Sequence, residues 1–96
     1  MKNYIALTFA KQETTDEIVK EHVGYLRELA ANKQFILAGP YVDAKDDEVG
    51  VFMFKAADKA AAEAVLTNDP FIAKGFQRYE LRELKIATEE SGFKPE

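Results

Sequence analysis

The stretch FILAGPYVDAKDDEVGVFMF, residues 35–54, decides the fold, because two apolar runs flank a charged segment in it. The first run, residues 35–38, is followed by Gly39 and Pro40, which is typical of the end of a strand. The second run, residues 49–54, is rich in β-branched and aromatic side chains, which favour strands. The charged residues 43–48 between them predict a solvated loop, to which we assign no metal.

The segments on either side of this pair complete a recognisable order. Residues 4–9 alternate between two sets of side chains, as a strand does, and residues 15–32 predict a helix whose start has the capping-box spacing of Thr14 and Glu17. The alanine-rich residues 59–66 predict a second helix and residues 76–86 a last strand. The order βαββαβ predicts an α+β, ferredoxin-like fold, a four-stranded antiparallel sheet with two helices on one face.

The two central strands predict a partner for the other face of that sheet. Residues 35–38 and 51–54 are apolar at consecutive positions, whereas a strand with one solvated face alternates. Two helices on one face leave the second face to something else that is apolar. We therefore expect a homodimer in which two copies of the chain pack sheet against sheet through this open face.

Length and composition narrow the class of protein. The 96 residues predict one domain, residues 1–87, followed by a polar tail, residues 88–96. The chain has no apolar run of about 18 residues and no convincing signal peptide, so we expect a cytoplasmic protein that does not enter a membrane. The net charge of −4 is scattered along the chain, which argues against nucleic acid as a partner. With no cysteine and one histidine, we expect neither a metal nor another cofactor.

The single histidine lies on the apolar stripe of the first predicted helix. Four side chains at spacings of four, four and three residues form this stripe: Ile18, His22, Leu26 and Leu29. An imidazole exchanges protons near neutral pH, so an inward-facing His22 is a candidate acid or base. The alternative is a core histidine whose nitrogens are satisfied by backbone groups.

Two short segments elsewhere carry further candidates. Asp69 followed by Pro70 is typical of a helix N-cap with proline at the first helical position, so Asp69 is expected to cap a short turn through Phe71. Gly39 and Pro40 are interpreted as a strand end that allows close backbone approach, and a role in lining a pocket is the alternative.

Taken together, these features resemble the YciI-like, YCII-related family of the dimeric α+β barrel superfamily. The resemblance runs from about residue 4 to residue 84 and is carried by His22, Ala38-Gly39-Pro40, Asn68-Asp69-Pro70-Phe71 and Gly75. It implies a histidine and an aspartate that face a pocket as an active-site pair, here His22 and Asp69, with Gly39, Pro40 and Phe71 as candidate substrate contacts. Many relatives carry an arginine three residues before the histidine, where this chain has Val19, so the family's means of holding a substrate anion does not carry over to this position.

The resemblance also implies a class of reaction. One characterised relative looks like a dehydrochlorinase of a chlorinated hydroxyhydroquinone, and similar barrels such as muconolactone isomerases act on ring compounds without a metal. Our first hypothesis is thus a cofactor-free lyase or isomerase in which His22 moves a proton and Asp69 orients the imidazole. The second is a non-catalytic module that binds a small molecule or serves assembly. A haem- or quinone-oxidising barrel is less favoured, because the chain has no tryptophan and one histidine.

Overall fold

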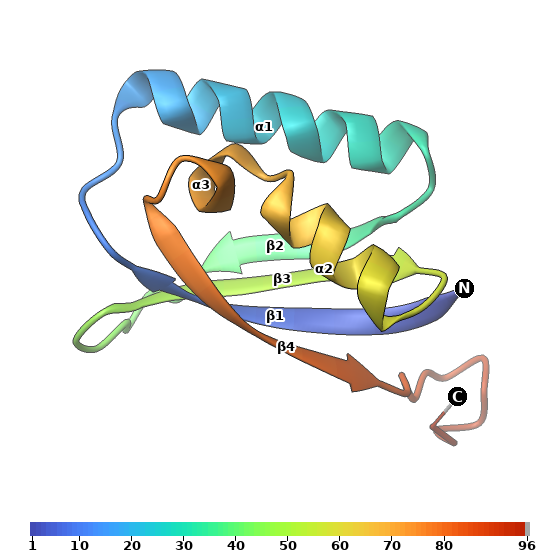
Figure 1. Ribbon diagram of the computed structural model, residues 1–96. Coiled ribbons are helices and arrows are strands. Elements are labelled where there is room, and N and C mark those ends of the chain that lie inside the picture. Colours follow the sequence, from blue (N-terminus) through green and yellow to red (C-terminus); the bar gives the residue numbers. More distant parts are fainter. Residues whose placement is uncertain (96) are drawn as a thin grey trace.

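The structure, a computed structural model, describes residues 1–95. Its elements follow the predicted order with one short helix added: β1 Lys2–Ala10, α1 Asp16–Ala31, β2 Phe35–Pro40, β3 Glu48–Ala56, α2 Lys59–Thr67, α3 Pro70–Ala73 and β4 Gln77–Leu84. The strands form one antiparallel sheet in the order β2-β3-β1-β4. Figure 1 shows all three helices on the same side of this sheet. The α+β, ferredoxin-like fold is therefore confirmed.

The start of α1 differs by one residue from the predicted capping box. Thr15 is the N-cap, and its side chain accepts a hydrogen bond from the backbone N–H of Ile18 at 3.2 Å. The pairing expected between Thr14 and Glu17 is therefore wrong. With Thr15 as the cap, Asp16 and Glu17 both lie in the first turn, where the helix dipole stabilises negative charge.

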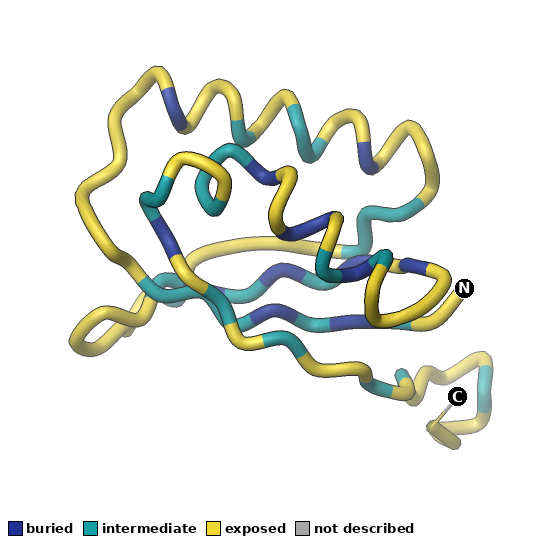
Figure 2. Tube along the Cα trace, in the orientation of Figure 1, coloured by how far each residue is buried: buried dark blue, intermediate teal, exposed yellow. Residues whose placement is uncertain are grey.

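The covered face of the sheet holds the hydrophobic core. Buried side chains from the sheet, α1 and α2 meet there: Tyr4, Ala6, Leu29, Phe52, Phe54, Ala56, Ala62, Val65 and Leu66. In Figure 2 the buried positions gather where α2 lies over the middle strands β1 and β3. Alanine at several positions of α2 lets this helix approach the strands closely.

The opposite face carries no helix from residues 1–95 (Figure 1). Apolar residues occupy its centre, and all but Leu37 are half-buried: Ile5, Leu7 and Phe9 of β1, Val51 and Met53 of β3, and Leu37 of β2, which is 45% exposed. Along β4, the residues paired with Phe9, Leu7 and Ile5 are Arg78, Glu80 and Arg82. We call this surface the open face.

Residues 85–95 follow β4 without forming a further helix or strand. Residues 88–95 form turns in which the Thr88 and Ser91 side chains bond to nearby backbone groups. The last residue of the predicted polar tail, residue 96, lies outside the described residues. None of the helices within residues 1–95 combines the length and apolar character needed to cross a membrane.

Candidate active site

His22 enters the site from α1 and faces the sheet. Ile18, one turn earlier, and Leu29, about two turns later, are both buried, so they hold this stripe of α1 against the rest of the molecule. The His22 side chain itself is 17% exposed. The inward position expected from the sequence is thus the position found.

Asp69 enters the site from the start of α3. It is the N-cap of that one-turn helix, and its Oδ1 accepts a hydrogen bond from the backbone N–H of Phe71 at 3.0 Å. The same Oδ1 lies 2.8 Å from Nδ1 of His22. Only 5% of the Asp69 side chain is exposed, so both contacts form away from bulk water. The capping role and the contact with the imidazole therefore share one oxygen.

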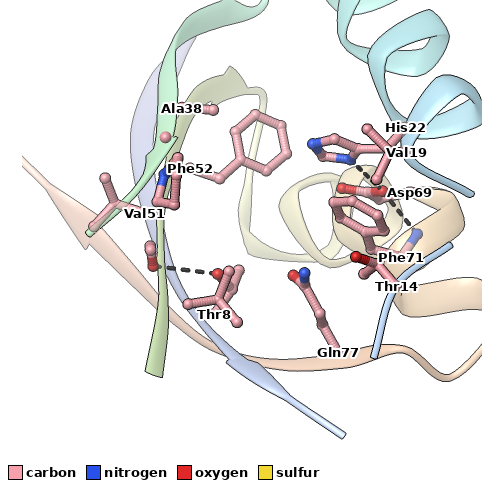
Figure 3. A pocket seen from close by; sticks show the side chains of 14 residues that line it. Thr8, Thr14, Val19, His22, Ala38, Val51, Phe52, Asp69, Phe71 and Gln77 are labelled. Carbon is pink, nitrogen blue, oxygen red and sulfur yellow. Dashed lines mark hydrogen bonds and ion pairs between the residues drawn. The ribbon is translucent and has the colours of Figure 1, made fainter. Parts of the chain in front are cut away.

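This contact determines which imidazole nitrogen carries the proton. An ionised carboxylate only accepts hydrogen bonds, so Nδ1 of His22 must be the donor. In the neutral ring the other nitrogen, Nε2, is then unprotonated and has a lone pair available. Figure 3 shows this second nitrogen on the side of the ring that faces the hollow.

Phe71 supports the imidazole from one side. Its ring stacks on that of His22, with centroids 4.0 Å apart and planes inclined by 17°. Because α3 supplies both Asp69 and Phe71, a single turn of helix sets the position and the plane of the imidazole. Phe71, a candidate substrate contact, thus lies both against His22 and on the wall of the hollow.

The hollow beside these groups is a cavity of about 330 Å³ between α1, α3 and the sheet. This volume is in the range typical of small-molecule sites. Its polar lining residues are Thr8, Thr14, His22, Asp69 and Gln77. Its other lining residues are Val19, Ala38, Gly39, Pro40, Val49, Gly50, Val51, Phe52 and Phe71. Every candidate residue from the sequence therefore borders one cavity, and none of the lysines and arginines within residues 1–95 lines it.

Gly39 and Pro40 lie at the rim, where both are exposed. The close backbone approach expected there involves a glycine that the sequence analysis did not single out. A Cβ placed on Gly50 of β3 would lie 2.1 Å from the carbonyl oxygen of Gly39, so β2 and β3 can pair this closely only with glycine at position 50.

Three polar lining residues were also missed, and one of them, Thr14, was considered only for the start of the helix. Thr8 of β1 and Gln77 of β4 face the cavity from the sheet. The signal for Thr8 was present, because it continues the inward stripe of Tyr4 and Ala6. Gln77 had no motif, and only the pairing of β4 with β1 assigns its face.

Tyr25, next to the site, has a structural role. The Tyr25 hydroxyl, three residues after His22, donates a hydrogen bond to the carbonyl oxygen of Val65 at 2.6 Å and so joins α1 to α2. Burial, together with the negative charges of Asp69 and Glu28, raises the pKa of Tyr25 to about 12. Tyr25 is therefore a neutral hydrogen-bond donor across the physiological range.

One exposed ion pair lies beside the site, and the described residues offer no cluster of metal ligands. Lys74, just after α3, contacts Glu21 of α1 at 2.8 Å, but both side chains are well exposed, so this pair contributes little stability. Within residues 1–95, no group of three or more Asp, Glu or His side chains is arranged to hold a metal ion.

Comparisons with known proteins identify the family of the chain. A model of the YCII-related domain matches residues 1–85. The chain belongs to the YCII-related family. The uncharacterized protein YjpA of Bacillus subtilis (strain 168) is 28% identical over 86 residues, which make up 90% of this chain and 98% of YjpA.

A solved structure shares the fold. It is the 5-chloro-2-hydroxyhydroquinone dehydrochlorinase of Burkholderia phenoliruptrix AC1100 in complex with 2,5-dihydroxybenzoquinone. The superposition has a TM-score of 0.63 with 18% sequence identity, and it covers 83% of this chain and 90% of the dehydrochlorinase chain. This YCII-related chain and the dehydrochlorinase therefore have a common architecture.

Proposed function

We propose that this YCII-related protein is a cofactor-free enzyme of the lyase or isomerase type that transfers protons on a small cyclic or aromatic molecule. The observation that carries the proposal is the 2.8 Å contact between Nδ1 of His22 and Oδ1 of Asp69, formed beside a cavity of about 330 Å³. Nε2 of His22 is the base, and Asp69 holds the tautomer and stabilises the imidazolium that forms.

The size and lining of the cavity support a ring compound as the substrate. A cavity of about 150 Å³ already accepts benzene, so a substituted single ring fits the larger space here. The lining is mostly apolar, with Phe52 and Phe71 among its walls. The structural neighbour adds support of another kind, since it is a dehydrochlorinase in complex with a dihydroxybenzoquinone.

Elimination of HCl from a chlorinated hydroxyhydroquinone illustrates the chemistry. Nε2 takes the proton of one ring hydroxyl and delivers it to the carbon that bears chlorine. A second hydroxyl then loses its proton, and chloride leaves with the electron pair of the C–Cl bond. The ring becomes a quinone, and the net change is the loss of one proton and one chloride. Acid/base catalysis of this kind contributes roughly 10²–10⁴-fold to the rate.

Chloride release from 5-chloro-2-hydroxyhydroquinone tests the proposal. We expect the wild-type protein to release chloride faster than buffer alone, and His22→Asn to lower that rate by roughly 10²-fold or more. Lys20→Ala, at an exposed position of the same helix, is the matched control and should keep the wild-type rate. An unchanged rate in His22→Asn would contradict the proposal. Binding of the compound without turnover would favour the alternative, a non-catalytic small-molecule-binding module.

We further infer that the open face is covered by a second copy of the chain. Its apolar centre, in which Leu7 pairs with Val51 and Ile5 pairs with Met53, is the kind of surface that sheets bury when they pack face to face. Arg78, Glu80 and Arg82 alternate in sign along β4. An isologous interface places the same strand twice about a two-fold axis, so arginine of one copy can meet glutamate of the other.

The oligomeric state tests this inference. Light scattering on a size-exclusion column should give twice the monomer mass of 10.8 kDa for the wild-type protein at micromolar concentration. Leu7→Glu, which puts a charge in the centre of the open face, should give a folded monomer. Lys20→Glu on the outer side of α1 is the control and should remain dimeric. A wild-type protein that is monomeric and well folded would contradict the inference.

A further inference from the structure

Gln77 is a buried polar residue whose amide group has no hydrogen-bond partner among residues 1–95. It is the first residue of β4, it is 7% exposed, and its side chain lines the cavity. Its carboxamide can donate two hydrogen bonds and accept two. Within residues 1–95 that group makes no hydrogen bond, and Figure 3 shows it directed into the same hollow that His22 faces. The amide therefore borders the hollow with its donors and acceptors available to whatever molecule occupies that space.

Thr8 and Gln77 are the two polar side chains that face the cavity from the sheet, and Gln77 is the one whose N–H donors make no hydrogen bond within residues 1–95. Thr8 Oγ1 donates its proton to the carbonyl oxygen of Gly50 at 3.2 Å, so it is left to act as an acceptor. Gln77 Nε2 therefore supplies the hydrogen-bond donor to an oxygen bound between Thr8 and Gln77. A ligand hydroxyl there can also donate to Thr8 Oγ1 or Gln77 Oε1.

The charge of the lining limits what the ligand can carry. In the part of the chain that the structure describes, no lysine or arginine lines the cavity, and Asp69 already brings one negative charge. A carboxylate or phosphate would be desolvated here without a cation to compensate it, which is strongly unfavourable. A hydroxyl or carbonyl oxygen loses little solvation free energy on entering the cavity, because a hydrogen bond from Gln77 replaces the one from water.

We propose that Gln77 is a ligand-recognition residue, and that the site takes an uncharged flat ring with oxygen substituents at two ends. The oxygen at one end meets Nε2 of His22, and the oxygen at the other end receives a hydrogen bond from Gln77 Nε2. This inference rests on the proposed function for the part played by His22. It adds the class of ligand and the residue that selects it.

Two small phenols that differ in one oxygen test the proposal directly. Hydroquinone carries a hydroxyl at both ends of the ring and phenol at one, and both are uncharged near neutral pH. Isothermal titration of the wild-type protein should show hydroquinone binding more tightly, by roughly three- to tenfold, the value of one hydrogen bond. 4-Hydroxybenzoate, which keeps the ring but adds a carboxylate, should bind much more weakly than hydroquinone.

Gln77→Met isolates the contribution of the amide, because methionine has nearly the same length and no donor. We expect the ratio of the hydroquinone and phenol affinities to fall to about one, with the affinity for phenol unchanged. Gln77→Asn keeps the amide but withdraws it by one carbon, so it should also lose the preference. It serves as the second variant if Gln77→Met does not fold.

Three results would overturn the inference. The first is a ratio of hydroquinone to phenol affinity that stays the same in Gln77→Met, including the case in which both affinities fall equally. The second is wild-type binding of 4-hydroxybenzoate as tight as that of hydroquinone. The third is failure of the wild-type protein to bind either hydroquinone or phenol at millimolar concentration. None of these measurements depends on turnover. The proposed function fails separately, if His22→Asn still releases chloride at the wild-type rate.

Discussion

The covered face of the sheet has two halves: along the same strands, one half is filled by packed side chains and the other borders the cavity. Under α2, Tyr4 of β1 and Phe54 of β3 meet Ala62 and Leu66, and all four are essentially excluded from solvent. Farther along the same two strands, Thr8 and Phe52 border the cavity instead. We call these regions the packed half and the hollow half. The strands run through both, so the difference arises in the layer of helices above them.

The break between α2 and α3 produces that difference. α2 ends at Thr67, and Pro70 cannot continue a helix because it lacks the backbone N–H. The chain restarts as one turn with Asp69 as its cap, which directs the carboxylate at His22 while leaving space over the sheet. We infer that the packed half supplies stability and the hollow half supplies ligand chemistry. Substitutions in the two halves should separate these two properties.

The largest effect on stability is expected in the packed half. Leu66→Ala removes a fully buried side chain from α2 and should lower the free energy of unfolding by about 2–5 kcal/mol. Urea denaturation followed by circular dichroism measures this change. The affinity for hydroquinone should remain close to that of the wild-type protein under folding conditions. A loss below about 1 kcal/mol would mean that the packed half is not the stabilising half.

Two glycine substitutions test the close contact between β2 and β3 at the cavity. Gly50→Ala should destabilise the protein by about 1–3 kcal/mol, because the new Cβ overlaps the Gly39 carbonyl oxygen. Gly39→Ala is the matched control, since a Cβ at that position meets nothing within 4 Å. Equal melting temperatures of the two variants would contradict this account of the β2–β3 contact.

Two substitutions of Asp69 distinguish its role as the cap of α3 from its contact with His22. Asp69→Ala removes the cap of α3 and should cost about 0.5–2 kcal/mol in unfolding free energy. Asp69→Asn keeps an acceptor for the Phe71 backbone N–H, and asparagine is as good a cap as aspartate, so its cost should be smaller. Thermal denaturation compares the two variants. A larger loss in Asp69→Asn than in Asp69→Ala would be inconsistent with the capping role.

The smallest effect is a dependence of stability on alkaline pH. In the folded protein the pKa of Tyr25 is raised to about 12, whereas an unfolded chain has an ordinary tyrosine with a pKa of about 10. The stability that comes from this raised pKa is therefore complete below about pH 10 and is lost as the pH rises towards 12. Tyr25→Phe should make the alkaline decline in melting temperature shallower. A decline identical to that of the wild-type protein would assign it to other groups.

The features that depend on short-range sequence were largely predictable, including two in the hollow half. Helical spacing placed Ile18, His22 and Leu29 on one inward stripe, and the dipeptide Asp69-Pro70 indicated the cap of α3. These inferences succeed because they depend on residues close together in the chain. The start of α1 was missed by one residue, because two adjacent threonines offer the same hydroxyl and the sequence does not choose between them.

The hollow half was only partly predictable. Gln77 and Thr8 lie in strands, where no local motif distinguishes a ligand contact from an ordinary polar residue. Their shared cavity follows from the pairing of β4 with β1, which joins residues almost seventy positions apart. The clash that reserves position 50 for glycine likewise depends on the register between β2 and β3. Long-range register is what a single sequence specifies least directly.

Nitrogen-15 NMR of the imidazole tests the central claim most directly, because His22 is the only histidine and its two ring nitrogens give unambiguous signals. For the neutral ring of the wild-type protein we predict a protonated Nδ1 and an unprotonated Nε2, a preference that weakens in Asp69→Asn. Hydroquinone should shift the Nε2 signal more than the Nδ1 signal. A wild-type ring protonated on Nε2, with a tautomer unaffected by Asp69→Asn, would contradict the account.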